Sequence, residues 1–69
     1  MVSYELLWLK MKEQNMTKTQ LRVAAGLSTS TFAKLTKNEM VSLDVLVRVC
    51  TVLRCQLSDI CCVEFKEGR

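Results

Sequence analysis

The sequence predicts an all-α fold of five short helices, and three observations lead to this expectation. The chain of 69 residues has no proline and two glycines, a composition that favours short-looped helices over a strand-rich fold. Apolar residues make up 49% of the chain, which favours a packed core over disorder. Helix-capping residues recur at intervals along it. We expect one domain covering residues 1–69, because the chain is too short for two.

The helix starts are marked by Ser or Thr, whose side-chain oxygen can accept a hydrogen bond from a free N–H group of the first turn. An apolar residue precedes each cap and another follows four positions after it, which is the pattern of a hydrophobic staple. Thr17 and Gln20 also form a capping box. The caps are Ser3, Thr17, Ser28 and Ser42, and the apolar pairs are Val2/Leu7, Met16/Leu21, Leu27/Phe32 and Val41/Leu46.

The helix ends are marked by Asn15, Gly26 and Asn38, since Gly and Asn tolerate the left-handed backbone found there. The tail, residues 62–69, is short and charged, and its alternating apolar residues are compatible with a short strand or an ordered arm. We expect helices near residues 4–14, 18–25, 29–37 and 43–54, and a short fifth helix at 57–61.

Two of these helices carry more apolar surface than one core requires. Helix 43–54 is apolar almost all round, which is typical of a central helix or of one that contacts a partner. Neighbouring helices can cover this surface, or a second copy can, because small domains often complete their core by pairing. The expected core residues are Tyr4, Leu7, Trp8 and Met11 in helix 4–14, and Leu43, Leu46, Val49, Cys50 and Leu53 in helix 43–54. The dimer-interface candidates are Leu6, Leu9, Val45 and Val52.

Four cysteines, Cys50, Cys55, Cys61 and Cys62, lie in the last third of the chain. They form no C-x-x-C spacing, and the chain has no histidine to complete a zinc site. We expect reduced thiols that behave as small, mostly buried apolar groups. A redox-responsive thiol and a four-thiolate metal site remain the alternatives.

The segment 17–38 carries a charge of +4 and the rest of the chain −1, which together give the net charge of +3. It contains four basic residues and no acid, whereas the rest of the chain has six basic and seven acidic residues. Its two short helices flank a tight turn at Gly26, and so short a turn forces the helices to cross steeply. A helix-turn-helix with charge of one sign is typical of proteins that bind a polyanion, and double-stranded DNA is the expected one. Capping hydroxyls and solvated lysines are the alternative reading, but they do not explain the lack of acids.

Over about residues 4–61 the chain resembles the lambda-repressor-like, Cro-type (XRE) helix-turn-helix family, and within it very short bacterial and mobile-element regulators. The resemblance implies a transcriptional regulator that inserts helix 29–37 in the major groove of DNA. We expect a repressor, because so small a chain has little surface for recruiting a polymerase, and a homodimer, because of the apolar excess. The residues that carry the resemblance are the motif MTKTQLRVAAGLSTSTFAKLTKNE and the segment after it, VSLDVLVRVCTVLRCQLSDI.

The resemblance also assigns roles by position. It implies a phosphate contact for Lys18, base reading by Thr29, Ser30 and Lys34, and thymine-methyl contacts near Thr31 and Ala33. Lys37 and Asn38 would bind phosphate at the end of the helix. Gln is common in the family at the positions of Lys18, Thr29 and Ser30, so the base preference does not carry over. Arg22 replaces a small Ala, and either a phosphate contact or a different helix crossing would account for it. The DNA-binding candidates are Thr17, Lys18, Arg22, Thr29, Ser30, Thr31, Lys34, Lys37 and Asn38.

Other functions follow less directly from these residues. A protein-interaction module, such as an antitoxin or co-regulator, would use the apolar excess, and a thiol sensor would use Cys61 or Cys62. An enzyme is not expected, because there is no histidine, no nucleophile–base pair and no phosphate-binding glycine loop. We expect no metal, cofactor or small-molecule ligand. With no signal peptide and no apolar run free of charge, we expect a cytoplasmic protein without a membrane span.

Overall fold

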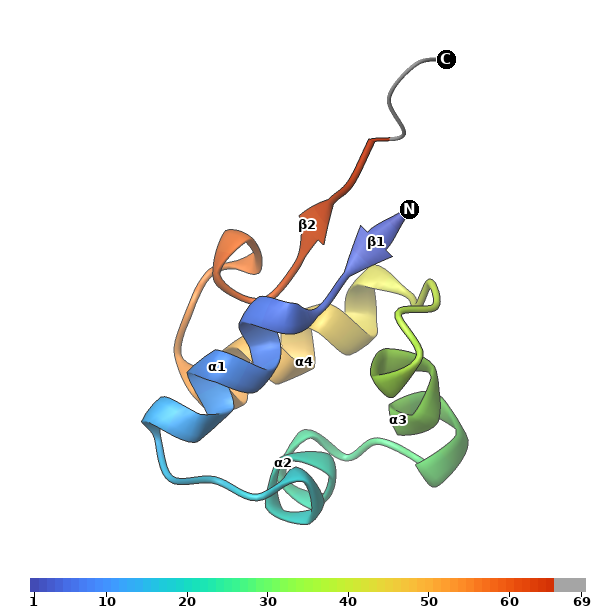
Figure 1. Ribbon diagram of the computed structural model, residues 1–69. Coiled ribbons are helices and arrows are strands. Elements are labelled where there is room, and N and C mark those ends of the chain that lie inside the picture. The colour runs from blue at the N-terminus through green and yellow to red at the C-terminus, as the bar shows by residue number, and fades with distance from the viewer. Residues whose placement is uncertain (66–69) are drawn as a thin grey trace.

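The computed structural model describes residues 1–65, and in this part of the chain four α-helices enclose one core (Figure 1). The expected all-α class is confirmed. The expected fifth helix at 57–61 is wrong in kind, because that segment makes a single 3-10 turn of three residues. The elements in order are β1 (Val2–Ser3), α1 (Glu5–Glu13), α2 (Lys18–Ala25), α3 (Thr29–Thr36), α4 (Leu43–Leu53), η1 (Leu57–Asp59) and β2 (Cys62–Val63).

The core takes residues from every helix, so each element is held by the others. Leu7, Leu21 and Phe32, the second members of three predicted staples, are all buried. Trp8, expected in the core, is half-buried at its edge. None of the helices in residues 1–65 has the length and apolarity needed to cross a membrane. The buried apolar residues are Tyr4, Leu7, Met11, Leu21, Ala25, Leu27, Phe32, Leu35, Val49, Leu53 and Ile60.

Three of the four predicted caps are confirmed. The hydroxyl of Thr17 accepts from the N–H of Gln20 at 3.1 Å, and the matching capping box is present. Ser28 and Ser42 cap α3 and α4 in the same way. Ser3 is not a cap, because it lies in β1 and the backbone turns into helix α1 one residue later, at Tyr4.

The two short strands bring the start and the tail of the chain together. Val2 pairs with Val63 and Ser3 with Cys62 in antiparallel register. The strand considered for the tail is therefore present at Cys62–Val63, whereas β1 was not predicted. The remaining tail residues, 66–69, lie outside the described part. In Figure 1 the two strands extend away from the helices, beyond the start of α1.

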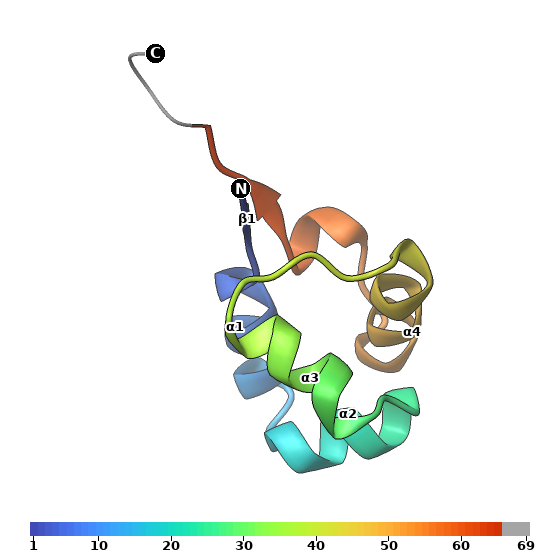
Figure 2. The same ribbon diagram turned by 90° about the vertical axis from the view of Figure 1, so that its right-hand side faces the viewer.

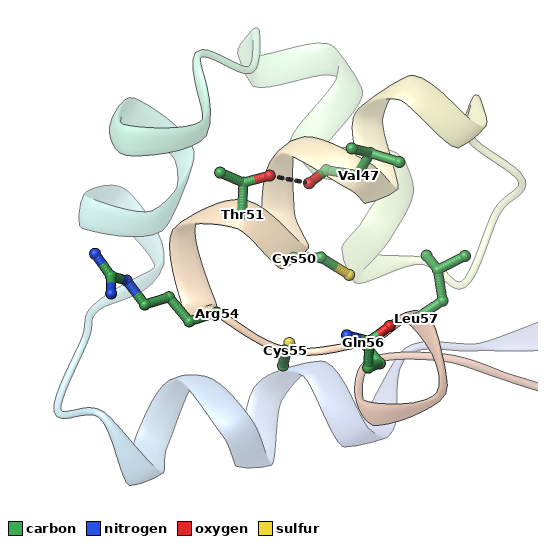
Figure 3. Close-up of a pocket in the computed structure, with 7 residues that line it drawn as sticks. All are labelled: Val47, Cys50, Thr51, Arg54, Cys55, Gln56 and Leu57. Atoms are coloured by element: carbon green, nitrogen blue, oxygen red, sulfur yellow. Dashed lines mark hydrogen bonds between the residues drawn. The ribbon is translucent and has the colours of Figure 1, made fainter.

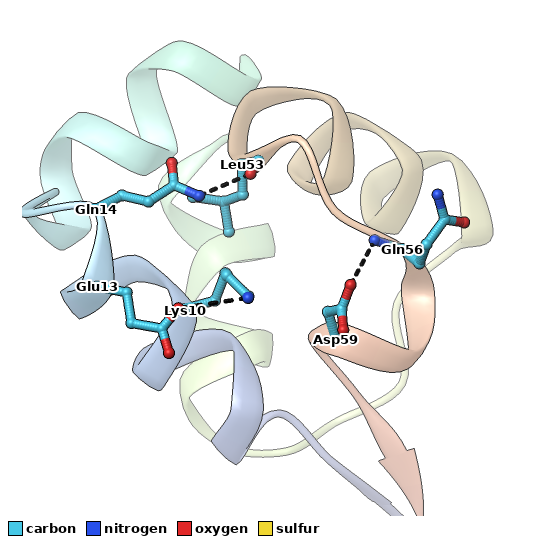
Figure 4. Close-up of polar contacts among 6 residues, drawn as sticks. All are labelled: Lys10, Glu13, Gln14, Leu53, Gln56 and Asp59. Atoms are coloured by element: carbon cyan, nitrogen blue, oxygen red, sulfur yellow. Dashed lines mark hydrogen bonds and ion pairs between the residues drawn. The ribbon is translucent and has the colours of Figure 1, made fainter.

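The end of α4 uses a left-handed residue that the sequence did not mark. Arg54 has a φ of 54°, although a side chain there costs about 1 kcal/mol relative to glycine. Two hydrogen bonds satisfy carbonyls of the last turn: the N–H of Cys55 donates to Cys50 at 3.1 Å, and Gln14 Nε2 donates to Leu53 at 2.7 Å (Figure 4). The second hydrogen bond joins the end of α1 to the end of α4, and this contact offsets the cost of the left-handed conformation at Arg54.

The side of α4 that faces the core is broader than expected. Leu46, Val49, Cys50 and Leu53 are buried or pack against the core, as predicted. Val45 and Val52 were placed opposite the core, but both are half-buried and pack against it. Leu43, expected inside, is 61% exposed, and Val47 is 49% exposed. Val45, Val49 and Val52 recur at helical spacing on the inner side, which leaves residues 43, 47 and 51 outward. Leu6 and Leu9 are exposed on α1, as expected.

Asn38 connects the loop after α3 to the start of α1. Its φ of 57° is left-handed, as predicted, and its Oδ1 accepts a hydrogen bond from the N–H of Tyr4 at 3.1 Å. The buried Tyr4 hydroxyl donates to the carbonyl of Glu39 at 2.8 Å. Asn38 therefore both tolerates the left-handed backbone conformation and supplies the hydrogen bond to the start of α1.

Asn38 substitutions should follow a fixed order of stability. We expect Asn38→Gly to lower the free energy of unfolding by about 1 kcal/mol, because the Tyr4 N–H loses its acceptor. Asn38→Ala should cost about 1 kcal/mol more, since alanine also disfavours positive φ. Urea denaturation of the three proteins measures the order. An alanine variant as stable as the glycine variant would contradict this account.

Candidate nucleic-acid interface

The turn between α2 and α3 fixes the geometry of the motif. Gly26 has a φ of 68°, and its N–H donates to the carbonyl of Val23 at 3.1 Å. A Cβ at this position would meet no atom within 4 Å, so the backbone conformation, and not lack of space, calls for glycine. Leu27 follows at once and is buried, which anchors the turn in the core. Figure 2 shows the result: α3 faces the viewer with α2 below it.

Two arginines reach the carbonyls of this turn. Arg22 Nη1 donates to the carbonyl of Leu27 at 3.2 Å, so its side chain lies over the junction of α2 and α3. Arg48 Nη1 lies 3.5 Å from the carbonyl oxygen of Gly26, and its other nitrogen pairs with Asp44 at 3.1 Å. The Arg48 contact was missed, because nothing in the sequence links residues 22 positions apart.

The outward face of α3 is polar and carries its cations toward the end of the helix. Thr29, Ser30 and Lys34 are exposed, and Lys37 is exposed immediately after the last turn. Thr31 and Ala33 are half-buried at the margin, while Phe32 and Leu35 face the core. The structure therefore brings the base-reading candidates onto one continuous surface.

The hydroxyls at the start of α3 are already linked. Ser28 Oγ accepts from the N–H of Thr31 at 3.1 Å and donates to Thr31 Oγ1 at 3.0 Å. Ser30 Oγ lies 3.2 Å from Ser28 Oγ. Because the single proton of Ser28 goes to Thr31, the Ser30 hydroxyl donates to Ser28 and keeps lone pairs to accept from another donor. In this state Ser30 favours donor groups such as base amines.

The start of α2 combines a cap with a cation. Thr17 is the N-cap of α2, so its exposed hydroxyl already accepts a hydrogen bond from the N–H of Gln20. Lys18, the first residue of α2, places its ammonium 4.9 Å from the centre of the Trp8 ring. Neither α2 nor α3 has an acidic residue in its first turn. The positive ends of both helix dipoles are therefore not neutralised, which favours binding of an anion.

Asn38 lies in the loop that follows Lys37, where a phosphate contact was expected. Its side-chain oxygen is committed to Tyr4, so that atom serves the fold. The amide Nδ2 group and the exposed position of the residue remain compatible with a phosphate contact. Sequence reasoning identified the place of this residue but missed its structural role.

The cysteines lie outside the helix-turn-helix, in α4 and in the segments that follow it. Cys50 and Cys55 line an open hollow of about 460 Å³ between α4 and η1 (Figure 3). Burial, reinforced by the neighbouring Cys55, raises the pKa of Cys50 to about 11, and burial also raises the pKa of Cys61. Both groups therefore stay as neutral thiols near pH 7. Within residues 1–65 no three metal-ligating side chains form a cluster that could hold a metal ion.

The raised pKa of Cys50 predicts a loss of stability at alkaline pH. The thiol binds its proton more tightly when folded, so its contribution is complete below its ordinary pKa of 9.0 and is lost as pH rises to about 11. Tyr4, whose pKa is also raised by burial, adds to the same loss. Thermal melting between pH 7 and 11 should show this fall, and Cys50→Val should reduce it. Cys62→Ser, at an exposed position, is the matched control. A Cys50→Val profile identical to the wild type would disprove the assignment.

The arrangement of residues defines a class of protein. The chain belongs to the family of Cro/C1-type helix-turn-helix DNA-binding domains, because the sequence model of that family matches residues 7–66. The resemblance drawn from the motif is thereby confirmed.

One solved structure, the crystal structure of the transcriptional regulator VanUg (Form II), is similar to this chain. The two are 52% identical, with a TM-score of 0.85, and the match covers 87% of this chain and 80% of that chain. No curated protein matches the chain. Family and neighbour together support a DNA-binding regulator.

Proposed function

We propose that the protein is a sequence-specific, double-stranded DNA-binding repressor of transcription that works in the cytoplasm as a homodimer and has no catalytic role. The observation that carries the proposal is the surface of α2 and α3, which has two helix starts without an acid in the first turn and the four cations of segment 17–38. Such a face attracts the phosphate backbone and leaves small side chains free to approach base edges. A chain of this size offers little further surface for recruiting a polymerase, which favours repression.

In this proposal the residues fall into two groups. Thr29, Ser30 and Lys34 read base edges in the major groove, with Thr31 at the margin. The phosphate contacts come from Lys18 and Lys37, assisted by Thr17, Arg22 and Asn38. Because Arg22 already holds the turn at Leu27, its contact with phosphate would come from the nitrogens that remain.

The dimer is supported by exposed apolar side chains. Leu6 and Leu9 stay candidates, and Leu43 and Val47 join them, because they are exposed where Val45 and Val52 are half-buried. Two protomers with three or four phosphate contacts each would give a log–log salt slope of about −5 to −7. Their half-sites would lie about 10 base pairs apart. A protein-interaction module, such as an antitoxin, would use the same apolar residues instead of pairing with a second copy.

Selection from random duplex DNA, followed by salt titration, tests the proposal. We expect an enriched two-fold-symmetric site with a steep salt slope. Enrichment of an unsymmetric half-site would contradict the dimer alone. No enrichment, with weak and fully salt-sensitive binding, would contradict the sequence-specific regulator and favour a protein partner.

Lys34 should determine one base position. We expect Lys34→Ala to cost about 1–3 kcal/mol of binding free energy at one base pair of the selected site, because a lysine can donate to guanine O6 and N7. Binding of duplexes substituted at each position measures this specificity. A loss that is equal for all sequences would show that Lys34 contacts phosphate instead.

A further inference from the structure

Trp8 on α1 contacts both helices of the motif. The Lys18 ammonium lies 4.9 Å from its ring centre, and its ring meets that of Phe32 edge-on, at 5.8 Å and 67°. Trp8 is half-buried, Phe32 is buried, and Lys18 is exposed. One side chain therefore joins the core face of α3 to the cation at the start of α2.

The helix itself does not favour Lys18 at this place. A lysine in the first turn faces the positive end of the helix dipole, and α2 has no acid in that turn to offset it. The face of an indole ring is electronegative and attracts an ammonium group. Trp8 thus supplies the attraction that keeps the Lys18 side chain in place.

We propose that Trp8 is a positioning residue for DNA binding, which holds the Lys18 ammonium ready for a backbone phosphate at the start of α2. An ammonium has three N–H donors, and those directed away from the ring can reach a phosphate. Because the Lys18 side chain is already ordered in the free protein, less conformational entropy is lost when it binds a phosphate. This inference rests on the proposed function, since it requires DNA as the ligand.

A double-mutant cycle separates positioning from a general effect on the fold. Wild type, Trp8→Leu, Lys18→Gln and the double variant are titrated with two fluorescein-labelled duplexes of equal length, the selected site and a mixed sequence, at several salt concentrations. We expect Lys18→Gln to reduce the magnitude of the salt slope by about 1 per protomer. Trp8→Leu should weaken binding about two- to fivefold when Lys18 is present, and not measurably when it is absent. Trp8→Phe, which keeps an aromatic face, should recover most of the affinity.

Three results would overturn the inference. Equal losses from Trp8→Leu in both backgrounds would show that the residue acts through the fold alone. Tighter binding by Trp8→Leu would show that the ring withholds Lys18 from DNA. Absence of binding by the wild type to either duplex would remove the proposed function and this inference together, so the two failures are distinguishable.

If Trp8→Leu does not fold, the tryptophan fluorescence of proteins that keep Trp8 provides a second test. Trp8 is the one tryptophan of the chain, so its emission reports this contact directly. DNA should change the emission of the wild type and change that of Lys18→Gln clearly less. An equal change in both proteins would also overturn the inference.

Discussion

Replacing Leu35 by alanine is expected to lower the free energy of unfolding by about 2–5 kcal/mol. Leu35 lies on the inner side of α3 with 0% of its surface exposed, so the change removes buried apolar atoms and leaves a cavity. A core in a domain this small rarely supplies more than about 3–5 kcal/mol in total. The variant should therefore be largely unfolded at 37 °C.

Leu43→Ala is the matched control for this change. It removes the same atoms from a helix, but from a side chain that is 61% exposed. We expect a change within about 0.5 kcal/mol in urea denaturation monitored by circular dichroism, at a protein concentration too low for pairing. Similar losses in the two variants would contradict the assignment of the core.

The double substitution Lys34→Ala and Lys37→Ala is expected to weaken binding to the selected site about 100-fold at physiological salt and to reduce the magnitude of the salt slope by about 1 per protomer. Both residues are exposed at the far end of the α3 surface, where no nearby acid pairs with them in the described residues. The loss of Lys37 removes a phosphate contact and its released counterion, and the loss of Lys34 removes a base contact.

The control removes two charges that lie outside α2 and α3. Lys10 pairs with Glu13 on the face of α1 toward η1, and Arg54 follows α4 (Figure 4). Lys10→Ala with Arg54→Gly leaves the same net charge, because either pair of changes takes +3 to +1. We expect less than a threefold change in affinity, a value of about 0.6 kcal/mol. Equal losses from the two pairs would show that net charge, and not the α3 surface, governs binding.

Features that depend on neighbouring residues were predictable from the sequence. The caps at Thr17, Ser28 and Ser42 and the turn at Gly26 are local, and each combines a side chain with a backbone requirement within a few positions. They set the boundaries of α2 and α3, and with them the surface on which the site candidates lie. The surface that carries the site candidates could therefore be predicted from the sequence.

Features that depend on distant residues were not predictable. The strand β1 has two residues, too few for a periodic pattern, and it forms only because the tail returns beside it. The outward position of Leu43 and the inward positions of Val45 and Val52 were missed, because a helix that is apolar almost all round does not indicate where its core side ends. The contacts of Trp8 with Lys18 and of Asn38 with Tyr4 join separate elements, so they appear only when the helices are packed.

Amide-resolved NMR titration of the labelled protein with duplex DNA tests the central claim most directly, because it identifies the surface that binds. The account predicts that the largest shifts fall at the start of α2 and along α3, within residues 17–38, and that α4 residues lining the hollow near Cys55 change little. Shifts concentrated on Leu43, Val47 and η1, or none in segment 17–38 at saturating duplex, would contradict it.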